Sequence, residues 1–490
     1  MRRSFQPSLR RTACLCGALA LAGCNAGPDF HTPDPGLPAK SFLGKPRPAV
    51  EGGEVSSSLD AKWWRQLRDP VLASLIERAA SANLDVQAAT TRLVGSRAQR
   101  DAAASAQFPT LGYSAQYQRE QLSQNGVVSL GSHLTTTPFI VPPIDVWQTG
   151  LDASWEVDLW GHVRRQVEAA EAQSEALEFE RRDVLVAVTA EIARDYAELR
   201  GVEAQIAIAK ANLDTAEDIS GLTRTRAQKG VTNYLDVENA AAQVESIRAE
   251  LPSLFDQQSA LIDAIGLLLG EPPQALRGEL AARGRIPFAP PRPPVGVASD
   301  LARRRPDIRR AEAQLHAATA NIGVAVAEFY PSFKINGNLS VNALDAAKLF
   351  RASSLQYQLG PTISVPIFDG GRLRSQLELR DAQAQEAFVV YHKTVLAAWT
   401  EVVDALVAFR AEQLRHARLS AQSAHQREAL HLARARYDNG VADFIRVLDA
   451  ERQLLQAELA EARSATAVAT NFVKLYKALG GGWEEIFPVD

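Results

Sequence analysis

The chain contains one long segment twice, and this duplication limits the folds that it can adopt. The stretch Arg226–Ala240 returns 210 residues later as Arg436–Ala450, with Arg, Gly, Val, an aromatic residue, Val and Ala in the same order. Phe108-Pro109 also returns, 222 residues later, as Tyr330-Pro331. A fixed offset between such long segments predicts two similar halves, each built as one supersecondary unit.

The repeated stretch has the pattern of a tight turn between two helices. In the second half, Asn439-Gly440 is typical of a left-handed helix end, and Asp443 is expected to cap the helix that follows. Each half is therefore predicted to contain a helical hairpin. The glycines and valines expected at the two tips are Gly230, Val231, Gly440 and Val441.

Hydrophobic periodicity places the helices and strands. Three- and four-residue apolar steps predict helices, and period-two alternation predicts strands with one apolar and one polar face. The first repeat, 61–270, is expected to contain a helix, strands at about 110–119 and 147–158, a long helix at 161–228 and a return helix at 233–269. The second repeat, 300–480, is expected to contain a helix, strands at about 332–341 and 356–367, a long helix at 371–439 and a return helix at 443–479. The Pro-rich residues 271–299 form a linker, and 481–490 form a C-terminal tail.

Three local signals refine this plan. Trp63-Trp64 opens a short amphipathic helix that is expected to run to about residue 80. Pro252 is expected to interrupt and kink the first return helix, because proline removes a helical hydrogen bond. Pro361 and Pro366 lie within the last strand, where proline removes a donor and blurs the strand end.

Composition and charge exclude several function classes. The net charge is −4 with a pI near 6.1, so the chain lacks the basic surface of a nucleic-acid-binding protein. The eight histidines show no metal-ligand spacing, and the sequence has no G-x-S-x-G motif, P-loop or Cys-x-x-Cys. We therefore expect neither an enzyme nor a protein with a bound metal or other cofactor.

The N-terminus has the pattern of an exported lipoprotein. Residues 1–23 combine a basic start with a short apolar run, and they end in Leu-Ala-Gly before Cys24. The pattern predicts cleavage before Cys24 and covalent lipid on that residue, followed by an extended arm at 24–60. Cys14 and Cys16 lie inside the signal peptide, so the mature chain would have no disulfide.

The four strands fit an outer membrane better than a soluble sheet. Their apolar face suits lipid, while their polar face, which includes Asp152, Lys334 and Asn338, suits a water-filled lumen. Lipid does not tolerate open strand edges, and four strands are too few to close a barrel. Several chains would have to share one barrel, and three chains would supply twelve strands. The alternative is a soluble four-stranded sheet beside a coiled coil.

Several motifs carry a family resemblance over essentially the whole mature chain. They are Gly27-Pro28-Asp29-Phe30, Trp63-Trp64 with Asp69-Pro70, Arg303-Arg304-Arg305-Pro306-Asp307-Ile308-Arg309, Ala327-Glu328-Phe329-Tyr330-Pro331-Ser332, Pro366-Ile367-Phe368-Asp369-Gly370-Gly371 and Val447-Leu448-Asp449-Ala450. With these motifs the chain resembles the TolC-type outer-membrane efflux proteins, in particular their NodT-like lipoprotein branch.

The resemblance implies a mainly α fold with a β-barrel part, made by a homotrimer. Three chains would form a 12-stranded barrel in the outer membrane and an α-helical tunnel through the periplasm. The implied partners are a periplasmic adaptor (membrane fusion) protein, a proton-driven inner-membrane efflux pump and outer-membrane lipid. The resemblance implies passive transport, with palmitate and other lipid on Cys24.

The resemblance also locates a periplasmic gate at the hairpin tips. Ile445 and Asp449 match the constriction of the family, and Leu235 and Asn239 are their counterparts in the first half. Some relatives carry a second Asp where this chain has Arg446, so a salt bridge from Arg446 to Asp236 or Asp443 is the expected replacement. The acidic ring would then come from the second half alone.

Two other functions remain open at this stage. The chain could be the outer-membrane duct of a type I protein secretion system, which has the same architecture and a different cargo. It could also be a lipidated periplasmic coiled-coil protein without a channel. The sequence does not indicate the cargo, because specificity in such systems usually lies in the pump.

Overall fold

The computed structural model describes residues 25–37, 61–121, 123, 142–281, 284–293 and 300–484. The predicted signal peptide at 1–23, Cys24, most of the expected arm and the last six residues of the tail lie outside these described residues. The chain forms two compact units. Unit 1 comprises the described residues within 1–32, 95–175 and 313–389, and unit 2 comprises those within 33–94, 176–312 and 390–490.

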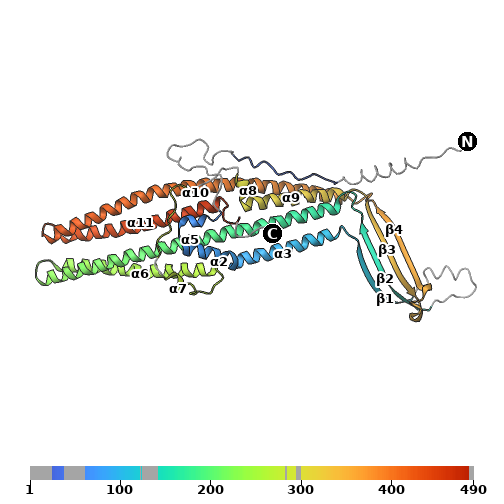
Figure 1. Ribbon diagram of the computed structural model, residues 1–490, viewed down its shortest axis with the longest axis horizontal. Coiled ribbons are helices and arrows are strands. Elements are labelled where there is room, and N and C mark those ends of the chain that lie inside the picture. The colour runs from blue at the N-terminus through green and yellow to red at the C-terminus, as the bar shows by residue number, and fades with distance from the viewer. Residues whose placement is uncertain are drawn as a thin grey trace, which may run out of the picture. The chain divides into compact units, whose positions relative to one another are not determined.

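Unit 1 contains one antiparallel sheet of four strands in the order β1-β2-β3-β4 (Figure 1). The strands are β1 (Thr110–Glu120), β2 (Ile144–Glu156), β3 (Ser332–Ala343) and β4 (Leu355–Ser364). β1 and β4 are each paired on one side only. Both repeats contribute a hairpin to the same sheet, because β2 of the first repeat pairs with β3 of the second.

The register of the sheet keeps the apolar and polar faces separate. Tyr113, Leu151, Leu339 and Tyr357 follow one another across the four strands, and all four side chains are exposed. The neighbouring row, on the opposite face, holds Gly112, Asp152, Asn338 and Gln358. The two-sided alternation read from the sequence is therefore maintained over the whole sheet.

Two strands differ in extent from the expectation. β2 begins at Ile144 and ends at Glu156 rather than spanning 147–158, and β4 ends at Ser364 rather than at 367. Pro366 has no backbone N–H, so the strand stops before it. Pro361 remains inside β4, opposite Ile335, and an edge strand accommodates a proline because one of its sides has no partner strand.

The long helices form two antiparallel hairpins, which belong to unit 2 from residue 176 and from residue 390 onward. The first pairs α5 (His162–Gln228) with α6 (Tyr234–Leu268), and the second pairs α10 (Arg372–Asp438) with α11 (Phe444–Ala478) (Figure 1). Each repeat also has a shorter helix before its strands, α3 (Leu84–Ser105) or α9 (Pro306–Ala327). No helix in the described part of the chain has an apolar stretch long enough to cross a membrane.

Two expectations about single helices are wrong. α6 continues through Pro252 as one helix, so this proline does not interrupt it. The segment after Trp63 forms two elements rather than one, the 3₁₀ helix η1 (Trp63–Leu67) and α2 (Pro70–Ala82). They separate because Arg68 has a left-handed φ of 55°, and because the Asp69 carboxylate caps α2 by accepting from the amides of Val71 and Leu72.

The remaining elements are short. The linker contains α7 (Arg277–Leu280) and leads into α8 (Leu301–Arg304), while η3 (Ala346–Lys348) and η4 (Ala352–Ser354) connect β3 to β4. The Arg-rich motif after the linker has a structural role. The Arg305 guanidinium donates to the Ala478 carbonyl at 2.6 Å and pairs with Asp307 and Glu401, which fixes the start of α9 against α10 and the end of α11.

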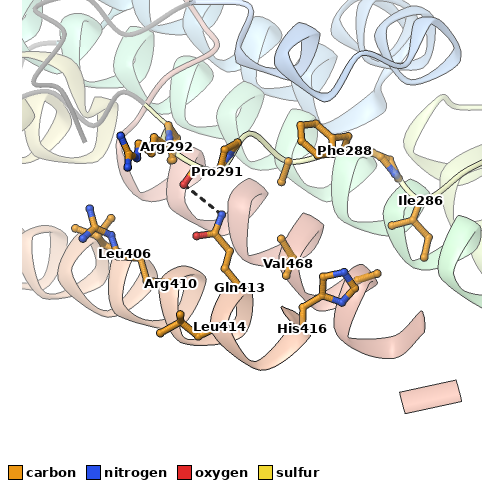
Figure 2. A pocket seen from close by; sticks show the side chains of 14 residues that line it. Ile286, Phe288, Pro291, Arg292, Leu406, Arg410, Gln413, Leu414, His416 and Val468 are labelled. Carbon is orange, nitrogen blue, oxygen red and sulfur yellow. Dashed lines mark hydrogen bonds between the residues drawn. The ribbon is translucent and has the colours of Figure 1, made fainter. Parts of the chain in front are cut away.

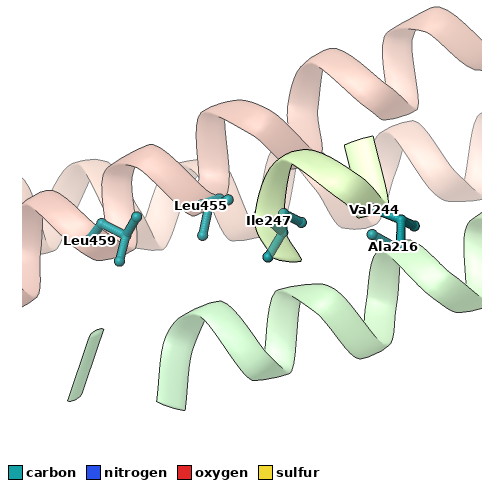
Figure 3. Packing of buried hydrophobic residues seen from close by; sticks show 5 residues of the cluster. All are labelled: Ala216, Val244, Ile247, Leu455 and Leu459. Carbon is teal, nitrogen blue, oxygen red and sulfur yellow. The ribbon is translucent and has the colours of Figure 1, made fainter. Parts of the chain in front are cut away.

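The core of unit 2 joins elements of both repeats. One end is aromatic, with Trp63 stacked on Tyr476 at 5.4 Å and Phe472 packed beside them. Further along, small and branched side chains from α5, α6 and α11 meet in one buried cluster (Figure 3). Its members are Ala216, Val244, Ile247, Leu455 and Leu459. The first hairpin is thereby packed against the return helix of the second.

Candidate functional site: the hairpin tips

The two tips have nearly identical backbones. Gly230 and Gly440 adopt left-handed φ values of 71° and 70°, a conformation that glycine enters without a steric penalty. In each tip the amide of the following valine donates to an arginine carbonyl, Val231 to Arg226 and Val441 to Arg436, both at 2.9 Å. These are the bonds of a Schellman helix end, so the left-handed cap expected from the sequence is present in both halves.

The helices that leave the tips begin differently. The Asn233 side chain caps α6 by accepting from the Asp236 amide at 2.9 Å. The expected cap by Asp443 is wrong, because its side chain makes no capping bond to α11. The Arg446 amide donates to the backbone carbonyl of Asp443 instead, at 3.2 Å, so that donor is already satisfied.

The predicted gate residues lie on exposed faces of the return helices. Ile445, 44% exposed, and Asp449 lie one turn apart on α11, together with the exposed Arg446. On α6, Leu235 is exposed and Asn239 is half-buried. The pairs that were expected to share a face therefore do so in both halves.

Arg446 makes no ion pair with Asp236 or Asp443 among the described residues, so the expected salt bridge is absent from the single chain. Asp236 instead accepts from the Thr232 hydroxyl.

The opposite face of α11 is anchored in the unit. Phe444, Val447 and Leu448 are almost fully buried. They pack in two adjoining clusters with residues of the other three long helices: Ile219, Ala240, Leu430 and Tyr437. At the tip, α11 therefore exposes Ile445, Arg446 and Asp449 on one side, while Phe444, Val447 and Leu448 pack on the other.

One contact between the two hairpins was not predicted from the sequence. The Arg226 guanidinium lies 4.5 Å from the centre of the Tyr437 ring and 3.6 Å from the Asp438 carboxylate. A cavity of about 230 Å³ lies beside this contact and is lined by residues of α5, α10 and α11, including Asp218 and Arg434. A comparison of the two repeats could have pointed to this contact, because the first half has Ala227 and Gln228 at the positions of Tyr437 and Asp438.

A second residue near the gate was also missed. Glu451 lies two positions beyond Asp449, and only 1% of it is exposed. Burial raises the pKa of its carboxyl group from 4.5 to about 7, although the nearby cations Arg434 and Arg452 act to lower this pKa. The region of the predicted gate therefore contains a carboxyl group with a pKa near neutrality.

A larger cavity lies away from the tips. It measures about 530 Å³ and separates residues 286–293 of the linker from α10 and α11 (Figure 2). Phe288, Leu406 and Val468 give it an apolar lining, and the Gln413 amide donates to the Pro291 carbonyl at 3.3 Å across it. Within the described residues, no group of His, Cys, Asp and Glu side chains could hold a metal ion.

The residues just after Cys24 are bound firmly within unit 1. Arg165, 2% exposed, donates to Asp29 at 2.6 Å and to Glu168 at 2.7 Å. Phe30 stacks on His316 with ring centres 4.5 Å apart. The Gly-Pro-Asp-Phe motif is thus the docking segment of the arm. Cys24 itself lies outside the described residues.

The chain is similar to known proteins over nearly its whole length. The family model described as "Outer membrane efflux protein" matches residues 75–271 and 297–481, one segment in each repeat. The pyoverdine export outer membrane protein OpmQ of Pseudomonas aeruginosa is 32% identical over 481 residues, which cover 97% of this chain and 98% of OpmQ. Nodulation protein T of Rhizobium leguminosarum bv. trifolii is 30% identical, with 96% of this chain and 97% of that protein covered.

Solved structures give the same result. The outer-membrane channel OprN superimposes with a TM-score of 0.86 at 34% identity, and the match covers 94% of this chain and 100% of OprN.

Proposed function

The chain belongs to the outer membrane efflux protein family, in its NodT-like branch, and on that premise we propose that three copies form the passive exit duct of a tripartite efflux pump. Its place in the cell is the outer membrane, and its working partners are a periplasmic adaptor and an inner-membrane pump. The trimer, its gate and its lipid anchor are the parts that the proposal adds.

The main support for this proposal is the four-stranded sheet, which has an exposed apolar face and two unpaired edges. The outer edges of β1 and β4 have no partner strand in the described chain. Backbone groups at such edges must be paired when the sheet lies in lipid. Pairing β4 of one copy with β1 of the next satisfies both edges, and three copies close a 12-stranded barrel.

The helices supply an independent argument for neighbouring copies. α10 carries a series of exposed apolar side chains along its length, which a lone chain would leave in water: Phe388, Val389, Val390, Leu396, Val407, Leu414 and Leu432. Five of them, Val389, Leu396, Val407, Leu414 and Leu432, lie on one face at helical spacing, and an exposed apolar face of this extent marks an interface. In the proposed trimer it packs against the adjacent copy and closes the wall of the periplasmic tunnel.

The tips are the end that meets the adaptor. Val231 and Val441 are both exposed beside their glycines, Gly230 and Gly440, and so offer small apolar contacts to a docking helical hairpin. The duct itself does no chemistry and consumes no energy. Opening is a shift between closed and splayed tips, driven by the adaptor's preference for the splayed state.

The gate is the ring formed by the second-half tips. Three copies of Ile445 and Asp449 would surround the axis, an apolar ring beside an acidic one. Leu235 and Asn239 supply the corresponding, uncharged positions of the first half. In this proposal, covalent lipid on Cys24 fixes the docked arm to the membrane.

The stoichiometry is tested by cross-linking in the outer membrane. Cysteine pairs are introduced on the polar faces of the outer edges, with Gln116→Cys or Gln118→Cys in β1 and Gln356→Cys or Gln358→Cys in β4. The mature chain has only Cys24, which is blocked by lipid in the proposal, so the background is low. We expect covalent trimers from at least one pair and none from the single-cysteine variants.

Other outcomes separate the remaining functions. Only monomers for every pair, with no conductance in planar bilayers, would support a lipidated coiled-coil protein and contradict the duct. A type I secretion duct would conduct equally well, but deletion of its gene would block secretion of a protein rather than raise sensitivity to small molecules.

A further inference from the structure

The second-half hairpin carries a buried carboxyl group without a hydrogen-bond partner. Glu451 lies on α11 between Val447 and Leu454, which pack with Leu430 of α10 in one cluster. Among the described residues, neither of its carboxylate oxygens has a hydrogen-bond partner. An ionised carboxylate is poorly solvated in such a place, while the protonated acid fits it at a much lower free-energy cost.

The two cations near Glu451 lower its pKa, but their effect is smaller than that of burial. Arg434 of α10 is the first cation acting on it, and Arg452 of α11 is the second. The Nε and Nη2 atoms of Arg434 are themselves buried without hydrogen-bond partners in the described chain. Arg452 donates from Nε to the Gln243 side chain of α6 at 2.8 Å.

The fourth helix adds no cation to this contact. α5 presents Ile219 to the cluster, and its Asp218 lines the neighbouring cavity together with Arg434.

The first half lacks this feature altogether. At the same offset that relates Asn239 to Asp449, the position of Glu451 is Ala241, and that of Arg434 is the exposed Arg224. The buried acid therefore lies only in the hairpin that supplies the acidic ring. A residue needed just for packing of the repeat would not require a carboxyl group there.

We propose that Glu451 makes the second-half hairpin responsive to protons, so that protonation holds α11 packed against α10 and ionisation favours their separation. The proposal rests on the proposed function, because separation of these helices opens the duct only if their tips form the gate. It adds a chemical signal, local pH, to the mechanical action of the adaptor.

The direction of the effect follows from linkage. The packed state binds the proton more tightly than the separated state, since the pKa of Glu451 is raised from 4.5 to about 7 by packing. The packed state is therefore fully favoured below about pH 4.5 and loses that advantage as the pH rises to about 7. Over this window the opening equilibrium increases by up to roughly 300-fold.

Hydrogen exchange of the purified full-length protein tests the proposal. Exchange of the peptide at 444–458 is measured from pH 5 to pH 8 and corrected for the intrinsic exchange rate. The matching peptide at 234–248 is the internal control. We expect the opening equilibrium of α11 to rise with pH in the wild type, and to be independent of pH in Glu451→Gln and Glu451→Ala. The alanine variant gives α11 the residue that α6 has.

Three results have distinct meanings. A wild-type α11 without pH dependence, or a pH dependence retained in both variants, would overturn the role of Glu451. A pH dependence lost in the variants, together with a single-channel conductance that rises over the same window, supports the whole proposal. The same exchange result with a conductance that ignores pH would instead contradict the proposed location of the gate.

Discussion

Phe444 and Ile445 are neighbours at the start of α11, and the structure assigns them opposite roles. Phe444 is 3% exposed and packs with Leu448, Ala240 and the Tyr437 ring, whose centre is 5.7 Å away. Truncating a buried phenylalanine to alanine removes about 3–5 kcal/mol of packing free energy. We expect Phe444→Ala to favour local opening of the α11 tip by about 3 kcal/mol, or roughly a hundredfold.

Hydrogen exchange of the peptide at 444–458 measures this opening directly. Ile445→Ala is the neighbouring control and is expected to change protection by less than about threefold, because nearly half of its side chain is already exposed. Tyr234→Ala is the matched control in the first half, since Tyr234 occupies the equivalent position and is 72% exposed. Equal loss of protection in Phe444→Ala and Tyr234→Ala would refute the asymmetry between the two tips.

Two further predictions concern the N-terminal arm. Asp29→Ala should release the arm, because the buried Arg165 would lose one of its two carboxylate partners. Limited proteolysis should then cut residues 25–37 several-fold faster than in the wild type. An unchanged rate would show that the Phe30–His316 stack alone holds the arm. Cys24→Ser should abolish incorporation of labelled palmitate while leaving the folded units intact, and persistent labelling would place the lipid elsewhere.

The repeat made most of the architecture predictable. Long helices carry many turns of periodic signal, so the hairpins and the left-handed turns at Gly230 and Gly440 were visible in the sequence. The strands were equally clear, because their residues alternate between an apolar and a polar face of the sheet. Their ends were less clear, since Pro366 ends β4 through a backbone effect that hydrophobic periodicity does not record.

The contacts around the gate were not predictable in the same way. The sequence alone does not mark Glu451 as buried, because its burial depends on how α11 packs against α10 across the hairpin turn. The contact of Arg226 with Tyr437 and Asp438 joins two hairpins and leaves no local pattern. Both could have been flagged by comparing the halves residue by residue, since an alanine replaces a large or charged side chain at the equivalent positions Ala227 and Ala241.

The break at Arg68 and the missing Asp443 cap have a different cause. Both depend on which of two competing local hydrogen bonds forms at a helix end. Residue preferences at helix ends favour one of them without determining which one forms. At the start of α2, the Asp69 side chain accepts from the first backbone amides. At the start of α11, the Arg446 amide donates to the backbone carbonyl of Asp443 rather than to its side chain.

Single-channel conductance in planar bilayers tests the central claim, that the second-half tips form the gate. We expect the wild-type protein to show a small conductance, and the double variant Ile445→Ser with Asp449→Ala to raise it several-fold by removing the apolar and acidic rings together. The equivalent first-half variant, Leu235→Ser with Asn239→Ala, should leave the conductance close to the wild-type value. An unchanged conductance in the second-half variant, or an equal rise in both, would contradict a gate supplied by Ile445 and Asp449.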